Sequence, residues 1–377
     1  MPPALAIAKP EEIGFIPERL QRAYDLLTEW VKKDRIPAAG FCVGRKGKMV
    51  EPFLVGRQRP DQPAPLRKDA QFLIASITKP VTVTGVMLLI EGGQLALEDF
   101  VADYVPKFAA NGKKEVRIHH LMTHTSGLPD MLPNNDQLRA AHKPFSAFID
   151  EICQLPLMFP PGTKVNYQSM GTAILAEIVH QVSGLALREF LLKEFFVPLG
   201  MNDTSLGWQP QNKDRIAAIR LAPEQQKTDW NWNSPYWLAF GAPWGGLVTT
   251  PADLARFCQM MLNGGRLGEV RILSQATVQA MTTNQLSNLP ELPEEERRCR
   301  PWGLGWRLNW RGATSSFGGS FGDLLSPRAY GHWGATGTMT WMDAELDTFC
   351  ILFTTQPLGD NERFLARISN VVTAAIA

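Results

Sequence analysis

The feature that most constrains the fold is the separation of the strand-like segments into two groups at opposite ends of the chain. Apolar runs of strand length lie at 38–43 and 49–55, and again at 303–308, 337–342 and 348–354. The stretch from about 76 to 240 consists of helical patterns and long loops instead. Strands at both ends around a helical middle predict a sheet domain that is discontinuous in sequence and carries a helical insertion.

We therefore predict an α/β fold of the α+β type, in which helices flank an antiparallel sheet and a second domain is mainly helical. Residues 1–75 and 242–377 form the predicted sheet domain, and residues 76–241 form the predicted helical domain. The cleft between these two domains is the expected site for a ligand. The length of 377 residues and the hydrophobic content of 45% allow a core of this size.

Local signals place the helices. The run 78–91 ends at a Gly-Gly pair suited to a helix C-terminus, and the run 251–262 follows Thr250, a good N-cap. Further predicted helices lie at 20–32, 171–182, 186–196 and 361–375. The first two strand segments are predicted to form a hairpin. The segment 288–300, rich in proline and acidic residues, is predicted to be an exposed loop.

Composition excludes several classes of function. Lys and Arg number 38 against 37 acidic residues and are scattered, which argues against nucleic acid or an anionic membrane as a partner. No apolar run approaches the roughly 18 residues of a membrane span, and the N-terminal segment lacks the features of a signal peptide. The five cysteines are widely spaced and mostly lie among apolar residues, which is typical of reduced core thiols and predicts a cytoplasmic protein.

The segment 72–83 contains a serine three residues before a lysine, Ser76 and Lys79, in apolar surroundings. Residues three apart share a helix face, so the amine can reach the hydroxyl, and a helix N-terminus supplies free N–H groups for an oxyanion. A lysine with a pKa of ~10.4 has to drop by about 3 units to act as a base near neutral pH, and burial produces such a drop. Taken alone, the pattern more often marks an N-cap serine and a solvated lysine.

Two further segments place polar side chains beside predicted elements. Tyr167 and Ser169 precede a predicted helix, and His332 enters a predicted strand within the glycine-rich run 330–337. A glycine there lets a ligand lie against the strand edge. Each segment is a weak signal alone, and its meaning depends on the order of all three along the chain.

Three other patterns suggest chemistry that the surrounding sequence does not support. The run 318–322 fits the G-x-S-x-G turn of α/β-hydrolases, but no helix is predicted after Ser320. His120 and His124 have the spacing of metal ligands without the glutamate of a zinc-binding helix. Cys299 lies between two arginines in a predicted loop and has no evident partner. We predict neither a metal site nor a cofactor.

Together, the motifs resemble the serine β-lactamase and penicillin-binding-protein superfamily in its class C-like branch. That branch also includes D-amino acid peptidases, transesterases and the family VIII carboxylesterases, which the chain resembles most. The resemblance covers roughly residues 10–370 and includes the phrases IHHLMTHTSGLPD at 118–130, GGLVTTPADLARFCQMMLNGG at 245–265 and YGHWGATGT at 330–338. It implies a β-lactamase/transpeptidase-like fold with the active site between the two domains.

By this resemblance, Ser76 is the nucleophile, Lys79 is its partner and Tyr167 takes part in proton transfer. The backbone N–H groups of Ser76 and Ala335 would form the oxyanion hole. Substrate contacts are expected from Ser169, His332, Trp333 and Gly334 and, within the aromatic segment 229–244, from Trp237. The aromatic residues of that segment equally suit packing of the helical lobe.

Three departures from the β-lactamase pattern narrow the expected function. Ser169 stands where β-lactamases have an asparagine that contacts the substrate amide. Trp333 replaces a threonine that helps to bind the β-lactam carboxylate, and His332 replaces a charged lysine. These changes remove polar and anion-binding groups and add an aromatic wall. They favour a neutral ester over an anionic lactam or peptide carboxylate.

We therefore predict a serine carboxylesterase that cleaves small-molecule esters of short to medium acyl chain through an acyl-enzyme, with weak β-lactamase activity as a possible by-product. One alternative is a β-lactamase or a D-aminopeptidase/DD-peptidase, and another is a non-catalytic binding or scaffolding protein of the same fold. The sequence leaves open whether Lys79 or Tyr167 is the base, and also the natural substrate, its stereochemistry and the oligomeric state.

Overall fold

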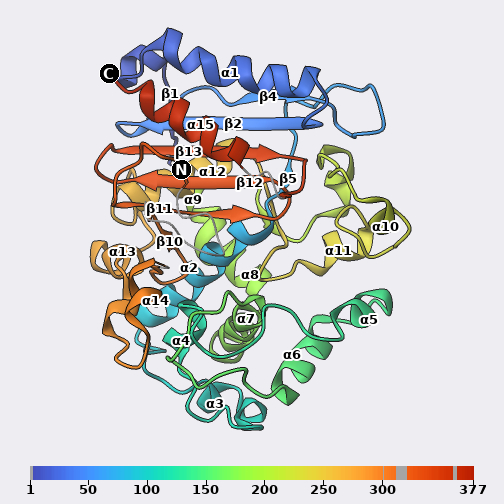
Figure 1. Cartoon of the computed structure of the whole chain (residues 1–377), viewed down its shortest axis with the longest axis vertical. Coiled ribbons are helices and arrows are strands. Elements are labelled where there is room, and N and C mark those ends of the chain that lie inside the picture. Colours follow the sequence, from blue (N-terminus) through green and yellow to red (C-terminus); the bar gives the residue numbers. More distant parts are fainter. Residues whose placement is uncertain (1–2, 300, 311–320, 360–362) are drawn as a thin grey trace.

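The computed structural model describes residues 3–299, 301–310, 321–359 and 363–377 of the chain. Figure 1 shows a sheet in the upper half of the molecule, with α1 (Pro17–Lys32) and α15 (Arg363–Ala374) on its outer side and most helices from the middle of the chain below it. Strands from both ends of the chain form this sheet. The predicted fold class, a largely antiparallel sheet flanked by helices, is confirmed.

In the described residues the main sheet has the strand order β1-β3-β2-β13-β12-β11-β10, and β4 also pairs with β2. The strands are β1 (Ala6–Ile7), β2 (Ala38–Arg45), β3 (Lys48–Met49), β4 (Phe53–Gly56), β10 (Arg307–Leu308), β11 (Ala329–Gly334), β12 (Thr338–Asp343) and β13 (Thr348–Thr354). Every pair is antiparallel except β1 with β3. Because β2 pairs with β13, the N-terminal and C-terminal strands meet in the middle of the sheet.

Both faces of the sheet are buried because alternate residues of its central strands point into two cores. Phe41 and Val43 of β2 lie in the core that α1 and α15 cover. Cys42 lies in the larger core on the other side, which includes α12 (Pro251–Leu262) and most of the helical region. This alternation follows from the period of two in a strand.

A small second sheet connects the main sheet to the helical region. Its strands are β5 (Phe72–Leu73), β6 (Ser205–Leu206) and β7 (Leu247–Thr249), with β7 in the centre. Directly after β5, a 3-10 turn at Ala75–Ile77 leads into α2 (Thr78–Glu91), which is buried along most of its length. The 3-10 turn that precedes α2 lies beside β11.

The other α-helices are short, apart from α7. They are α3 (Val101–Tyr104), α4 (Ile118–Met122), α5 (Asn135–Ala140), α6 (Phe145–Gln154), α7 (Ser169–Ser183), α8 (Leu187–Leu191), α9 (Val197–Leu199), α10 (Pro223–Gln226), α11 (Pro235–Phe240), α13 (Gln275–Thr282) and α14 (Glu294–Cys299). A two-stranded hairpin of β8 (Arg266–Leu267) and β9 (Val270–Arg271) follows α12. The predicted helices at 78–91 and 251–262 and the predicted strand at 348–354 have the observed bounds.

Two local predictions need correction, and the helix predicted at 186–196 is confirmed with a change of helix type. The predicted loop at 288–300 contains α14, whose acidic first turn and basic last turn suit the helix dipole. The predicted strand at 303–308 is reduced to β10, because Gly305 has a φ of +74° and the Gly303 N–H bonds to Trp306 O, which closes a turn. The predicted helix at 186–196 is α8 followed by a π-helical turn, Leu192–Phe196. In the predicted helix at 361–375, residues 361 and 362 lie outside the described part.

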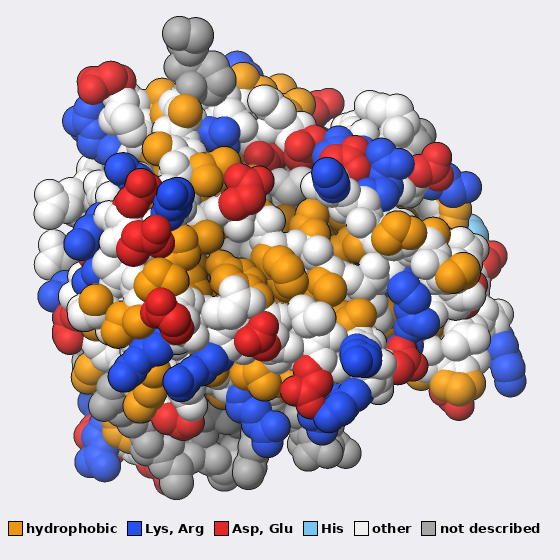
Figure 2. All heavy atoms as spheres, turned by 90° about the horizontal axis from the view of Figure 1, so that it is seen from above, with side chains coloured by type: hydrophobic (Ala, Val, Ile, Leu, Met, Phe, Trp, Pro, Cys, Tyr) orange, Lys and Arg blue, Asp and Glu red, His pale blue; other side chains and the backbone are white. Residues whose placement is uncertain are grey.

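Figure 2 views the molecule from above and shows basic and acidic side chains interspersed around a central apolar band on that face. This mixture matches the formal net charge of +1. Within the described residues, no single helix is long and apolar enough to cross a membrane. Among these described residues, one bent pair, α7 with the segment Leu187–Leu199 at 75°, passes by length and composition alone.

Candidate active site

Ser76 lies in the turn between the end of β5 and the start of α2. The residue before it, Ala75, has a φ of +46°, a left-handed conformation that costs an L-residue about 1–2 kcal/mol. Thr78 holds this turn, because its Oγ1 donates to Ala75 O at 2.6 Å and accepts from the Leu247 N–H at 3.0 Å. The constrained turn presents the partly exposed Ser76 side chain at the start of a buried helix.

Lys79 lies one helical turn after Ser76. Its Nζ donates to Ser76 Oγ at 3.0 Å and to Trp244 O at 3.1 Å, and its side chain is 1% exposed. Burial lowers the pKa of the amine from 10.5 to about 7, although the charge of Asp130 opposes this shift. A large fraction of Lys79 is therefore neutral near pH 7 and can accept a proton from Ser76.

Tyr167 completes the group around Ser76. Its hydroxyl is hydrogen-bonded to the Ser76 side chain, and its ring centre lies 4.5 Å from Lys79 Nζ. Burial raises the pKa of the phenol far above its ordinary value of 10, and the charge of Asp130 adds to this effect. The phenol therefore stays protonated at neutral pH, where it can both accept and donate a hydrogen bond.

Among the described residues, three aromatic rings lie around the Tyr167 ring. The ring centres of His124, Trp302 and His332 lie 4.8, 6.0 and 6.0 Å from it. The sequence analysis placed His332 here through the resemblance but treated His124 only as a metal-ligand pattern and did not select Trp302. These two residues come from distant loops, and a pattern in one segment does not show that they meet.

Hydrogen bonds assign the tautomers of the two histidines. The Gln168 N–H donates to His124 Nδ1 at 3.2 Å, so the proton of neutral His124 lies on Nε2. His332 Nδ1 lies 2.6 Å from Trp333 O, so His332 is protonated on Nδ1 and its Nε2 is an acceptor. Burial, with the Lys79 charge, lowers the pKa of His332 to about 3 and the pKa of His124 well below 6.5. Both rings are therefore neutral near pH 7.

The turn between β11 and β12 packs against the segment that precedes Ser76. Thr336 Oγ1 donates to Leu73 O at 2.8 Å, and Thr338 Oγ1 donates to Ile74 O at 2.9 Å. A Cβ on Gly334 would lie 2.2 Å from Ile74 O, so this close approach requires glycine. Ala335 follows at an exposed position of the same turn. The predicted oxyanion-hole residues thus belong to two segments that are fixed to each other.

Ser169, a predicted substrate contact, begins α7 two residues after Tyr167. Its Oγ donates to Asp130 Oδ1 at 2.6 Å, and its N–H donates to the same oxygen at 2.9 Å. The Ser169 hydroxyl is therefore engaged by an exposed carboxylate. No sequence motif had marked Asp130, although it ends the phrase at 118–130 that supports the family resemblance.

Trp333, another predicted substrate contact, is partly buried on β11. Its ring centre lies 4.5 Å from that of Phe321 and 4.6 Å from the guanidinium carbon of Arg307. Arg307 is 9% exposed, so its charge is largely shielded from solvent. The Trp333 ring therefore adds an apolar surface to β11, and the Arg307 guanidinium is stacked on this ring.

Trp237, the remaining predicted substrate contact, lies on α11 and is 3% exposed. Its ring packs against Phe240 and Trp244, and the guanidinium carbon of Arg139 lies 3.9 Å from its centre. Trp237 thus belongs to the main core. Its link to Lys79 is indirect, because the neighbouring Trp244 supplies the carbonyl that accepts from Lys79 Nζ.

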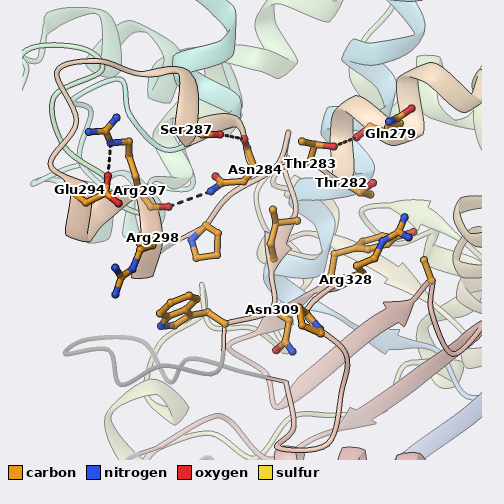
Figure 3. Close-up of a pocket in the computed structure, with 16 residues that line it drawn as sticks. Gln279, Thr282, Thr283, Asn284, Ser287, Glu294, Arg297, Arg298, Asn309 and Arg328 are labelled. Atoms are coloured by element: carbon orange, nitrogen blue, oxygen red, sulfur yellow. Dashed lines mark hydrogen bonds and ion pairs between the residues drawn. The ribbon is translucent and has the colours of Figure 1, made fainter.

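Trp302 belongs to a segment that also borders a separate cavity. Figure 3 shows this cavity of about 620 Å³, lined from α13, α14 and the β10–β11 edge of the sheet. Glu296 of α14 accepts from the Val165 N–H at 3.1 Å, and Val165 and Trp302 share an apolar cluster with Tyr167. One wall of the cavity therefore supports the loop that carries Tyr167. Neither Ser76 nor Lys79 lines it.

The patterns that the sequence analysis set aside have other surroundings. His120 Nδ1 and His124 Nδ1 accept from the backbone N–H groups of Arg117 and Gln168. Across the described residues, no cluster of three or more His, Cys, Asp or Glu side chains is arranged to hold a metal ion. All five cysteines are free and four are buried, as predicted, while Cys299 on α14 is partly exposed. Ser320 lies outside the described residues.

Comparison with known proteins gives matches over nearly the whole chain. The family described as Beta-lactamase matches residues 23–374. An Escherichia coli K12 protein named "Putative D-alanyl-D-alanine carboxypeptidase" is 27% identical over 94% of this chain and 86% of its own length. A penicillin-binding-protein homologue from Caulobacter crescentus superposes with a TM-score of 0.77 at 21% identity, covering 96% of this chain and 99% of the other. A family VIII carboxylesterase superposes with the same score and coverage at 22% identity.

Proposed function

From the premise that this chain belongs to the Beta-lactamase family, we propose that it is a serine hydrolase whose substrates are carboxylic esters. The observation that carries the proposal is the contact of 3.0 Å between Lys79 Nζ and Ser76 Oγ, made by a buried amine whose pKa is about 7. A nucleophile in contact with a base that is partly neutral at working pH is the arrangement that covalent catalysis requires.

In the proposed reaction, Ser76 Oγ attacks the ester carbonyl and transfers its proton to neutral Lys79. The negative charge on the carbonyl oxygen is received by the backbone N–H groups of Ser76 and Ala335, and such donors contribute about 3 kcal/mol each. Tyr167, hydrogen-bonded to Ser76, donates its hydroxyl proton to the oxygen of the departing alcohol as the C–O bond breaks, and Lys79 returns to Tyr167 the proton that it took from Ser76. Water then attacks the acyl-enzyme by the reverse proton path and releases the acid.

The opposite directions of the two pKa shifts support Lys79 as the base. Burial favours the neutral forms of both side chains, which is the basic form of lysine but the acidic form of tyrosine. Deprotonation of Tyr167 would require a buried phenolate beside a neutral amine. We therefore assign proton acceptance to Lys79 and proton donation to the Tyr167 hydroxyl.

The charges near Ser76 support an ester over an anionic substrate. His332 is neutral near pH 7 because its pKa is about 3, and the position beside it carries an indole. The nearest described cation on this strand pair, Arg307, is 9% exposed and stacks on Trp333. Asp130 adds a negative charge that reaches both Lys79 and Tyr167. A substrate carboxylate would therefore find little compensation for the loss of its hydration.

The second candidate is a D-alanyl peptidase or β-lactamase activity. The name of the Escherichia coli relative favours it, and the same acylation machinery would serve either reaction. The proposal ranks esters first because the Trp333 and His332 side chains offer no permanent positive charge to a peptide carboxylate. A non-catalytic role is disfavoured by the intact contacts among Ser76, Lys79 and Tyr167.

The test compares the wild-type protein with Ser76→Ala on p-nitrophenyl butyrate, nitrocefin and D-alanine p-nitroanilide. We expect the butyrate ester to have the highest kcat/KM and Ser76→Ala to lose at least 1,000-fold of it, roughly the effect of removing an essential nucleophile. Ser320→Ala, at the alternative G-x-S-x-G serine, is the matched control and should retain activity. Wild-type activity in Ser76→Ala, or faster turnover of nitrocefin or the anilide, would overturn the respective part of the proposal.

A further inference from the structure

Two hydrogen bonds from Ser169 fix the position of the Asp130 carboxylate near Lys79 and Tyr167. The Ser169 hydroxyl and the Ser169 N–H both donate to one carboxylate oxygen, Oδ1, at 2.6 and 2.9 Å. The Ser169 N–H also lies 3.1 Å from the backbone oxygen of Asp130. These contacts fix the carboxylate at the first turn of α7, two residues after Tyr167, while the residue itself stays exposed.

The anchoring leaves the second carboxylate oxygen available. Oδ2 of Asp130 makes no hydrogen bond within the part of the chain that the structure describes, and no lysine or arginine there forms an ion pair with it. A carboxylate that is exposed, oriented and unpaired next to a reaction centre can attract a cation or repel an anion.

The negative charge of Asp130 acts on the two ionisable groups next to Ser76. Its charge raises the pKa of Lys79 and of Tyr167, so both groups lie within range of its Coulomb interaction. Among the described residues, the other charged group that acts on Tyr167 is Arg307, which is stacked on Trp333. In the reactive form Lys79 is neutral, and His332 and His124 are neutral as well. Within the part of the chain that the structure describes, Asp130 is then an exposed charge that acts on both Lys79 and Tyr167.

We propose that Asp130 determines substrate specificity, selecting esters whose acyl chain carries a positive charge, such as an ammonium group, and disfavouring acyl chains that carry a carboxylate. This inference rests on the proposed esterase function and adds the charge class of its substrate. Ser169 acts in it as the positioning residue, because its two hydrogen bonds set the direction of the Asp130 carboxylate.

The test uses three p-nitrophenyl esters with different charges at the end of the acyl chain. The cationic ester is the 4-(trimethylammonio)butanoate, and the neutral ester is the 5,5-dimethylhexanoate, in which a carbon replaces the nitrogen without a change of shape. The anionic ester is the mono-ester of adipic acid. The measured quantity is the ratio of kcat/KM for each charged ester to kcat/KM for the neutral one.

The variant Asp130→Asn keeps an oxygen that can accept both Ser169 hydrogen bonds and removes only the charge. We expect it to lower the cationic-to-neutral ratio and to raise the anionic-to-neutral ratio, each by about three- to ten-fold, the range for two unit charges a few ångströms apart in partly aqueous surroundings. Both effects should shrink as salt is added to the wild-type assay, and the ratios of Asp130→Asn should be nearly independent of salt. Taking ratios cancels any change in the pKa of Lys79.

Asp136→Asn is the matched control, because Asp136 is an exposed carboxylate on the nearby helix α5 and does not perturb Lys79 or Tyr167. It should keep the wild-type ratios. Equal ratios in Asp130→Asn and wild type, or the same shift in Asp136→Asn, would refute the selectivity while the neutral ester is still cleaved through Ser76. Failure of the wild type to cleave even the neutral ester would instead refute the proposed function.

Discussion

Replacing Lys79 by methionine should abolish activity and make the folded protein more stable at neutral pH. The substitution keeps an unbranched side chain of similar length in a site that is 1% exposed. It removes the proposed base and also removes an amine whose pKa is lowered by burial from 10.5 to about 7. Between these two pKa values the unfolded chain binds a proton that the folded chain releases, so the folded state is penalised.

The size of the effect follows from the two pKa values. Below about pH 7 the penalty is fully present, and it decreases as pH rises towards 10.5, which gives about 4 kcal/mol at pH 7 and about 2 kcal/mol at pH 9. Against this gain, the substitution removes two hydrogen bonds, to Ser76 Oγ and Trp244 O, at about 1 kcal/mol each. The net stabilisation is therefore about 2 kcal/mol at pH 7 and close to zero at pH 9.

Urea unfolding of the wild type and Lys79→Met at pH 7 and pH 9 measures this difference, because titrations common to both proteins cancel. Lys113→Met is the matched control. Lys113 is also fully buried and burial lowers its pKa as well, but its Nζ donates to three backbone oxygens, of Ala110, Cys153 and Leu155, so the substitution removes three hydrogen bonds instead of two. We expect that variant to be destabilised. A Lys79→Met protein that is no more stable than wild type at pH 7, or whose advantage does not decrease at pH 9, would contradict the assignment of a low pKa to Lys79.

Two further predictions follow from the same geometry. First, kcat/KM for p-nitrophenyl butyrate should rise about ten-fold per pH unit below pH 7 and level off above it, because Lys79 with a pKa of about 7 must be neutral. His332, with a pKa of about 3, should add no step between pH 5 and 9, and a profile that is flat through pH 7 would exclude Lys79 as the base. Second, Gly334→Ala should lower kcat by about 100-fold or more by disturbing the oxyanion hole, since its Cβ would lie 2.2 Å from Ile74 O and from Thr338 Oγ1. Gly359→Ala, whose Cβ would meet no atom within 4 Å, is the control, and equal activity of the two variants would argue against a constrained contact at Gly334.

The elements that the sequence predicted well are those whose ends carry local signals. The helix at 251–262 begins after Thr250, whose side chain accepts from the Asp253 N–H as an N-cap does, and α2 ends at the Gly92–Gly93 pair. The predicted strand at 303–308 failed because a buried turn around Gly305 packs on Val83, a contact that the local pattern does not contain. Helix α14 was missed because proline and charge outweighed its dipole-compatible ends.

In the candidate site, too, the residues that could be predicted are those whose contacts are local in sequence. Ser76 and Lys79 could be predicted as a pair because their contact is made within one helical turn. Tyr167 and His332 were placed there only by the resemblance to a known family. His124, Trp302 and Asp130 act through contacts between segments that are remote in sequence, and no spacing rule predicts such contacts. In the aromatic segment 229–244, Trp237 lies in the main core, which agrees with the packing role that the sequence left open beside substrate contact. Its contact with a substrate stays a prediction.

The turn that carries Ser76 is held in place by segments from both ends of the chain. The turn that carries Ser76 is fixed by Thr336 and Thr338 from the C-terminal strands and by Leu247 from the small sheet. These contacts hold Ala75 in a left-handed conformation that an isolated segment 72–83 would not keep, because nothing there offsets its cost. The geometry between Ser76 and the β11–β12 turn therefore exists only after the N-terminal and C-terminal strands have paired. In the proposed function, a serine and a lysine three residues apart form a reactive pair because the turn is held in this geometry and because burial lowers the pKa of the amine.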